Sequence, residues 1–218
     1  MKKIFAVLLL FLTISLQAQK TIYESIHFDK LSKNHKLIAI IPFLATLELD
    51  SEEYNVSEKE LQSLEKQEGL AVQDALESYF LRRKTKKKFS VDFQNIEDTN
   101  AILSKNNITL DNIDIYTTQE LCELLEVDAL VSGNLTLSAL ISKGVPEVDF
   151  ISIILGKSDF GRIAVKISDG KSGKLLWKYE KIINRKSGKN TKAIIESMMK
   201  VAARKFPYDK DKKWKKKD

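Results

Sequence analysis

Few side chains in this 218-residue sequence have the types and spacing that catalysis or metal binding requires. Catalysis generally needs a titratable group that can be tuned near neutral pH, and the only histidines are His27 and His35. Neither histidine has a second ligand at the spacing of a zinc motif. Gly156-Lys157-Ser158 has the form of the end of a phosphate loop, but Ile151 stands where the first glycine is required. We therefore expect no catalytic residue, no cofactor and no metal.

The carboxylates that could act as acids or bases are scattered over predicted turns and helix caps. They include Asp111, Asp114, Asp128 and Asp169. A structural role is expected for them, and the sequence leaves open whether two of them meet across a cleft. The single cysteine, Cys122, lies among leucines, which favours a small core residue over a reactive thiol.

Positive charge is concentrated at the C-terminus. Residues 205–218 contain seven lysines and three aspartates, so they supply +4 of the net charge of +6, and Lys2 and Lys3 supply the rest. A neutral body and only five arginines beside 31 lysines argue against nucleic-acid binding. The tail has two interpretations: a segment kept soluble by its charge, or a peripheral contact with an anionic membrane surface. The candidate contact residues are Lys212, Lys213, Trp214, Lys215, Lys216 and Lys217.

The N-terminus has the three regions of a secretory signal peptide. Lys2-Lys3 precede an apolar run over residues 4–16, and Gln17-Ala18-Gln19 follows, which predicts cleavage after Ala18. We expect a signal peptide at 1–18, a single domain at 19–208 and a disordered lysine-rich tail at 209–218. Such a signal peptide predicts export of the chain. No cysteine follows the signal peptide that could carry a lipid anchor.

Hydrophobic periodicity predicts a mixed α/β fold. Two apolar alternating segments around Asp169-Gly170-Lys171-Ser172-Gly173 predict a β-hairpin over 160–183, and both glycines are expected to supply positive φ in its turn. A long helix between the first two strands is the crossover that parallel pairing needs, so the sheet should be mixed, with helices packed on it. No regular element is predicted for 20–34, and 141–158 is expected to be an irregular excursion. The other predicted elements are strands at 37–43, 89–93 and 127–140, helices that begin at the capping boxes of Ser57 and Thr117, a helix at 98–106, and a helix that begins near Thr191 and ends before Pro207.

Three segments carry a resemblance to a bacterial envelope module. They are KLIAIIPF at 36–43, VDALVSG at 127–133 and AVKISDGKSGKLLW at 164–177. The chain resembles the module shared by the curli-secretion lipoprotein CsgG, the penicillin-binding-protein activator LpoB and the TolB N-terminal domain. Ile167, Asp169, Gly173 and Trp177 occupy the positions of the hairpin motif, whereas Asp128 precedes Ala129 in the reverse of the usual order.

This resemblance implies a mixed α/β sheet, a periplasmic or outer-membrane-associated location, and a non-enzymatic role through protein partners. The leading hypothesis is therefore an exported protein-binding or assembly accessory module that is not an enzyme. Two alternatives remain: an oligomeric outer-membrane secretion component, in which residues 148–155 pack between subunits, and a hydrolase of envelope substrates whose carboxylates meet only in the fold. A homo-oligomer is compatible with the accessory module and with the secretion component.

Overall fold

The fold is described from a computed structural model that covers residues 21–48, 57–86, 89–138, 159–184, 192–195, 197 and 208. The predicted signal peptide at 1–18, the segment 141–158 and the lysine-rich tail at 209–218 lie outside the described residues. No helix within the described ranges combines the length and the apolar character needed to cross a membrane.

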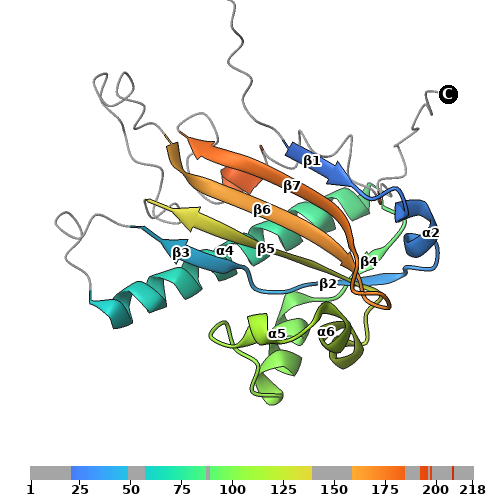
Figure 1. The fold of residues 1–218 in the computed structure, drawn as a ribbon, viewed down its shortest axis with the longest axis horizontal. Coiled ribbons are helices and arrows are strands. Elements are labelled where there is room, and N and C mark those ends of the chain that lie inside the picture. Colours follow the sequence, from blue (N-terminus) through green and yellow to red (C-terminus); the bar gives the residue numbers. More distant parts are fainter. Residues whose placement is uncertain are drawn as a thin grey trace, which may run out of the picture.

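A seven-stranded mixed sheet forms the centre of the described structure (Figure 1). Its order is β1-β7-β6-β5-β2-β4, and β3 also pairs with β5. Strands β2, β3 and β4 run parallel to their neighbours, whereas β1, β6 and β7 pair in antiparallel fashion. The strands are β1 (Thr21–Glu24), β2 (Leu37–Ile40), β3 (Leu44–Leu47), β4 (Asp92–Phe93), β5 (Ala129–Leu137), β6 (Asp159–Asp169) and β7 (Leu175–Asn184).

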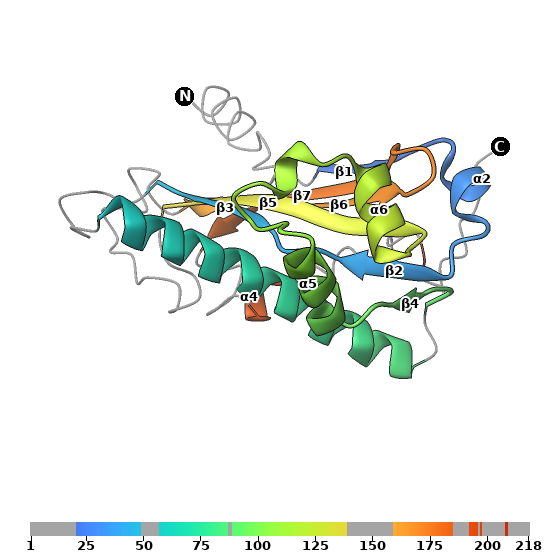
Figure 2. The same cartoon turned by 90° about the horizontal axis from the view of Figure 1, so that it is seen from below.

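Helices pack on both faces of this sheet. Figure 2 shows the long helix α4 on one side of the sheet and α6 on the other. The helical elements are α2 (Phe28–Ser32), α4 (Glu58–Thr85), α5 (Ile96–Lys105), the short 3-10 helix η1 (Ile113–Ile115) and α6 (Thr118–Leu125). Residues 192–195 and 197 are also helical.

The core is divided by the sheet into two apolar clusters. The larger cluster joins α4 to inward-facing strand residues such as Ile38, Val131 and Trp177. The smaller cluster joins α5 and α6 to the opposite face through Ala39 and Leu130. Because successive strand residues point to opposite faces, adjacent residues of β2 and β5 serve different clusters.

The predicted fold class is confirmed, and so are several of its local signals. Ser57 and Thr117 begin α4 and α6 with complete capping boxes. The hairpin predicted over 160–183 forms as β6 and β7, and a parallel β2–β4 pair follows the crossover through α4. The helix predicted after Thr191 is confirmed over its described residues, and its predicted positions Met198, Val201 and Ala202 lie outside them.

Two predictions about the N-terminal part are wrong. The segment 20–34 contains β1 and α2, although neither shows a period in the sequence, because β1 is four residues long and α2 is five. The strand predicted at 37–43 ends at Ile40, and the chain resumes as β3 at Leu44. Both pieces pair in parallel with β5, so the interruption lies between two parts of one ladder.

Phe43 fills this interruption, and two glycines make room for it. A Cβ on Gly69 of α4 would lie 2.0 Å from the Phe43 carbonyl oxygen, and one on Gly133 of β5 would lie 2.3 Å from the Phe43 ring. The Gln73 amide of α4 donates to the Ile40 carbonyl (2.7 Å), and the Leu47 amide donates to Glu65 (2.9 Å). Side chains of α4 thus satisfy backbone groups on both sides of the break.

Candidate functional site

Two of the scattered carboxylates converge at one end of the sheet. Asp128 immediately precedes β5 and Asp169 ends β6, and the antiparallel pair Ala129–Asp169 brings them together. Asp128 Oδ2 accepts from the backbone amides of Lys36 (2.6 Å) and Leu37 (3.0 Å). Asp169 Oδ1 lies 2.8 Å from Nε2 of His35. The two carboxylates therefore hold the same short segment at the start of β2.

His35 lies between Asp169 and a residue from the far end of the chain. Its Nδ1 is 2.6 Å from the hydroxyl of Tyr208, and the side chains of His35 and Asp169 are only 5% and 4% exposed. Both contacts are satisfied when Nε2 carries the proton: Nε2–H donates to Asp169, and Nδ1 accepts from Tyr208. The Tyr208 ring also packs edge-on against Phe28 of α2, and its carbonyl accepts from the Ser90 amide. Tyr208 thus contacts α2 and the residues just before β4.

The polar surroundings favour the ionised carboxylate of Asp169. Burial opposes ionisation, but hydrogen bonds from Ser172 and His35 outweigh it and lower the pKa of Asp169. Burial, together with the charges of Asp169 and Asp128, raises the pKa of the Tyr208 phenol. The same causes raise the pKa of the Cys122 thiol to about 12. Cys122 is buried, as the predicted small core residue should be.

The β6–β7 turn closes over this network. The amide of Ser172 donates to Asp169 Oδ2 (2.7 Å), and the Ser172 hydroxyl bonds the same oxygen. The expectation of positive φ holds for Gly173 (φ 67°) and is wrong for Gly170. Gly170 is required instead by close packing, because a Cβ there would lie 2.7 Å from Cys122 Sγ and 2.8 Å from the Asp128 carbonyl.

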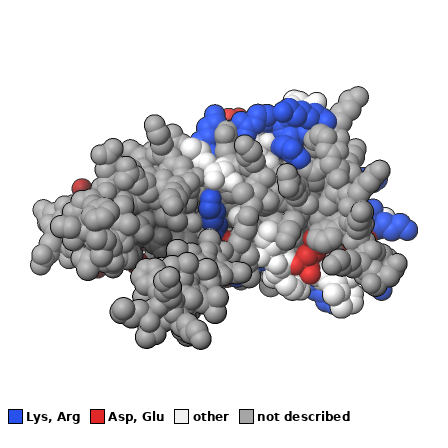
Figure 3. All heavy atoms as spheres, turned by 90° about the horizontal axis from the view of Figure 1, so that it is seen from above, with Lys and Arg blue, Asp and Glu red and all other residues white. Residues whose placement is uncertain are grey.

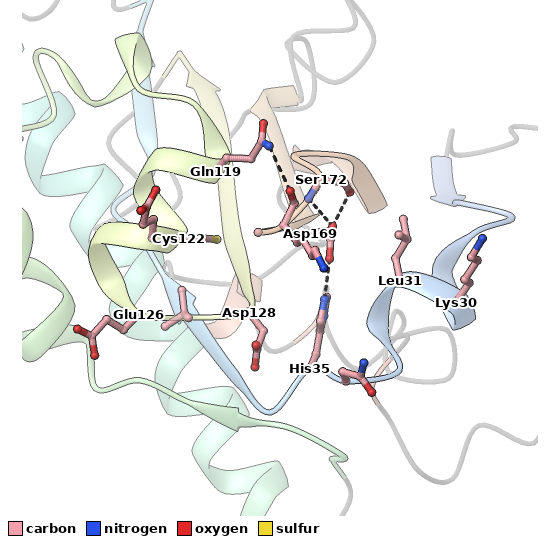
Figure 4. A pocket seen from close by; sticks show the side chains of 14 residues that line it. Lys30, Leu31, His35, Gln119, Cys122, Glu126, Asp128, Asp169 and Ser172 are labelled. Carbon is pink, nitrogen blue, oxygen red and sulfur yellow. Dashed lines mark hydrogen bonds and ion pairs between the residues drawn. The ribbon is translucent and has the colours of Figure 1, made fainter.

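A hollow of about 980 Å³ opens above these residues (Figure 4). Its inner part contains His35, Cys122, Asp128 and Asp169, and its outer part is lined by α2, α6 and the β6–β7 turn. The exposed residues on its rim are Lys30, Asn34, Gln119, Glu123, Glu126 and Lys171. Gln119 also donates to the Lys171 carbonyl (3.2 Å), which ties α6 to the turn.

The inner groups of this hollow are arranged to hold backbone segments. Both ring nitrogens of His35 and both carboxylate oxygens of Asp169 have hydrogen-bond partners. Asp128 uses one oxygen for two backbone amides, and its side chain is the inner group that remains half-buried and accessible. Within the described residues, no group of three His, Cys, Asp or Glu side chains is placed to hold a metal ion.

The other residues considered from the sequence lie away from this hollow. His27 is exposed at the start of α2, Asp111 forms an exposed ion pair with Lys66 (2.7 Å), and Asp114 is exposed on η1. Lys212, Lys213, Trp214, Lys215, Lys216 and Lys217 lie outside the described residues, as does the Gly156-Lys157-Ser158 segment. Tyr208 was not identified from the sequence, because a contact between residues 35 and 208 has no local signal. Ser172 was named only as a turn residue, although its partner Asp169 is three positions away.

A group of cations lies at the C-terminal end of α4. Figure 3 shows Lys and Arg side chains gathered along the margin where the C-terminal part of this helix lies. Arg82, Arg83 and Lys84 occupy its last turn, where cations favour the negative end of the helix dipole. Arg82 lies over the Tyr79 ring (5.8 Å), and Lys84 pairs with Asp92. These cations therefore have roles within the fold.

Comparison with known proteins finds similarity in solved structures alone. No family model matches the chain, and neither does any curated protein sequence. Lipoprotein GNA1162 from Neisseria meningitidis is 12% identical, with a TM-score of 0.43, over 77% of this chain and 98% of that one. The LpoB C-terminal domain from Salmonella enterica is 4% identical, with a TM-score of 0.39, over 72% and 96%. The PelC dodecamer from Paraburkholderia phytofirmans is 10% identical, with a TM-score of 0.33, over 88% and 98%.

LpoB is also one of the proteins whose motifs the sequence resembles. At TM-scores of 0.33 to 0.43 and identities of 4 to 12%, these similarities say nothing about function. The function of this chain has to be inferred from its own residues.

Proposed function

We propose that this chain is an exported, non-enzymatic protein of the bacterial cell envelope that acts as a protein-binding or assembly accessory module. The signal-peptide pattern at 1–18 and the three envelope-module segments support export and an envelope location. A periplasmic or outer-membrane-associated position follows from this address. The lysine-rich tail at 209–218 would add a peripheral contact with an anionic membrane surface.

One observation carries the non-enzymatic part of the proposal: the His35–Asp169–Tyr208 network is buried and fully hydrogen-bonded. A general acid or base must reach a proton on the substrate, within about 3 Å or through one water. His35 and Asp169 are 5% and 4% exposed at the side chain, and their polar atoms already have partners inside the fold. These residues therefore fix the backbone around the hollow, and the exposed surfaces perform the work.

Crosslinking in intact cells, followed by fractionation and identification of the bound protein, tests this function. We expect the cleaved protein in the envelope fraction with a protein partner attached. Two chains should be compared, one complete and one lacking residues 209–218, because loss of membrane association alone in the shortened chain would separate the tail from partner binding. Recovery of the cleaved protein only from the cytosol would contradict the proposal.

The hydrolase alternative has one observation in its favour, namely that Asp128 and Asp169 line the same hollow. Its test is hydrolysis of isolated envelope material by the purified protein and by Asp128→Asn. We expect no hydrolysis by either protein. Turnover that is lost in Asp128→Asn, with folding intact, would establish the enzyme instead.

A further inference from the structure

Among the described residues, helices cover only part of the sheet face opposite α4. Leu130 on this face packs beneath α6, but Ser132 and Asn134, further along β5, lie beyond the apolar cluster. Figure 1 views this side, with β7, β6 and β5 in front of α4. We define the open face by Ser132 and Asn134 of β5, Arg162 and Lys166 of β6, and Lys178 and Glu180 of β7.

Two of the three cations on the open face, Lys166 and Arg162, have no ion pair within the described part of the chain. Lys166 stands directly opposite Lys178 in the β6–β7 ladder, and like charges in that arrangement repel. Lys178 is compensated by Glu180 at 2.9 Å. Three cations and one carboxylate leave this face with a charge of +2.

Lys166 also lines a separate hollow of about 300 Å³. Ser132 and Asn134 form the sheet side of this hollow, and Asp114 and Tyr116 form the side next to η1. Asp114 is exposed, and no ion pair between it and Lys166 occurs among the described residues. Lys166 is half-buried as a residue, and no carboxylate within the described ranges forms an ion pair with it. A bound anion would supply that carboxylate.

We propose that the open face is the docking surface for an acidic segment of a protein partner, whose carboxylates pair with Lys166 and Arg162. This inference rests on the proposed binding function and names its surface. The side chains of Ser132 and Asn134 can donate to and accept from the peptide groups of such a segment. A polypeptide fits better than a flat membrane surface, because Lys166 lines a hollow that an acidic side chain of a partner can enter.

The open face is tested by titrating the full mature chain with a poly-L-glutamate 20-mer while the backbone amide chemical shifts are monitored by NMR. We expect shifts on β5, β6 and β7 around Lys166. Lys166→Glu and Arg162→Glu should each weaken binding by at least about tenfold, since each places a repulsive charge at the contact. Lys59→Glu is the matched control, because it makes the same charge change at an exposed position of α4, outside the open face and the hollow near His35. It should change binding by less than about twofold.

Three results would overturn the inference: equal weakening in all three variants, loss of binding only on removal of residues 209–218, or shifts confined to the end of α4. Vesicles of phosphatidylglycerol and phosphatidylcholine form a further arm. If Lys166→Glu abolished vesicle binding but left poly-L-glutamate binding intact, the surface would recognise lipid and the inference would be wrong. Lys166→Thr, which adds no repulsive charge, provides a second variant if Lys166→Glu fails to fold.

The same variants in intact cells separate this inference from the proposed function. If Lys166→Glu and Arg162→Glu leave crosslinking to the envelope partner unchanged, the binding function stands and the open face is not its surface. If the complete chain captures no partner, the binding function itself fails.

Discussion

The surroundings of His35 and the open face of the sheet differ in whether their charged groups have partners within the fold. Around His35, the carboxylate of Asp169 is buried and accepts from the imidazole and from the Ser172 amide. On the open face, Lys166 is half-buried, lies opposite Lys178 and has no ion pair among the described residues. A buried network with every member satisfied strengthens the fold, whereas an uncompensated cation weakens it. The comparison separates residues that maintain the structure from residues that are available to a partner.

Loss of the Asp169 charge should give the largest effect. Asp169→Asn retains the size of the side chain but places an NH₂ group against donors, so one of the His35 or Ser172 contacts is lost. We expect the free energy of unfolding to fall by about 3 kcal/mol, the upper range for a hydrogen bond to a charged group. Urea unfolding measures it. Asp74→Asn, at an exposed position of α4, is the control and should change stability by less than about 0.5 kcal/mol.

The pH dependence of that difference is a second test. The folded state lowers the pKa of Asp169 below its ordinary value of 3.8, so its contribution to stability is present above pH 3.8. The contribution is lost as the pH falls through the folded-state pKa. The unfolding free energies of wild type and Asp169→Asn should therefore converge in acid. A constant difference between pH 7 and the acid limit would show that the charge of Asp169 is not responsible.

Tyr208→Phe should have the next largest effect. It removes the hydroxyl that lies 2.6 Å from His35 Nδ1 and leaves a buried nitrogen without a partner. A loss of about 1–2 kcal/mol in unfolding free energy is expected, because the buried acceptor keeps its desolvation penalty. Tyr23→Phe is a matched control, since Tyr23 is 47% exposed on the edge strand β1. Equal effects in the two variants would mean that Tyr208 contributes only its ring.

Lys166→Thr should have the smallest effect and the opposite sign. Relief of the Lys166–Lys178 repulsion, together with a β-branched residue in a strand, should stabilise the protein by about 0.2–1 kcal/mol. Lys178→Thr is the matched control: it relieves the same repulsion but breaks the Lys178–Glu180 pair, so its gain should be smaller. If Lys166→Thr destabilised the protein, Lys166 would have a favourable partner in the folded chain, and its charge would not be free for a bound segment.

Local signals predicted the elements of this fold better than they predicted its contacts. The capping boxes of Ser57 and Thr117 and the turn at Gly173 act within four or five residues, so the sequence reveals them directly. Elements β1 and α2 are too short to show a period and depend on neighbours distant in the chain. The register of β1, for example, is set by pairing of Thr21 with Glu180. An edge strand of this length owes its existence to the strand beside it.

The candidate site was harder to predict for the same reason. Asp128 and Asp169 look like unrelated turn residues in the sequence, and only the β5–β6 register places them beside one another. Tyr208 meets His35 from 173 positions away. Part of the open face is visible in the sequence, because Ser132, Asn134 and Thr136 alternate with apolar residues along β5. The cross-strand position of Lys166 relative to Lys178 depends on the bulge-containing β6–β7 register, which composition does not fix.

The packing of α4 over the β2–β3 break limits how this fold can be rebuilt. At Gly69 the helix backbone comes so near the Phe43 carbonyl that a methyl group would occupy the same space, and Gln73 and Glu65 serve backbone groups on either side. A foreign amphipathic helix with an equivalent apolar stripe could not replace α4. It would also need a glycine at the position of Gly69 and polar side chains at those of Gln73 and Glu65. Chimeras between this chain and other mixed-sheet proteins should therefore exchange α4 and the β2–β3 segment as one unit.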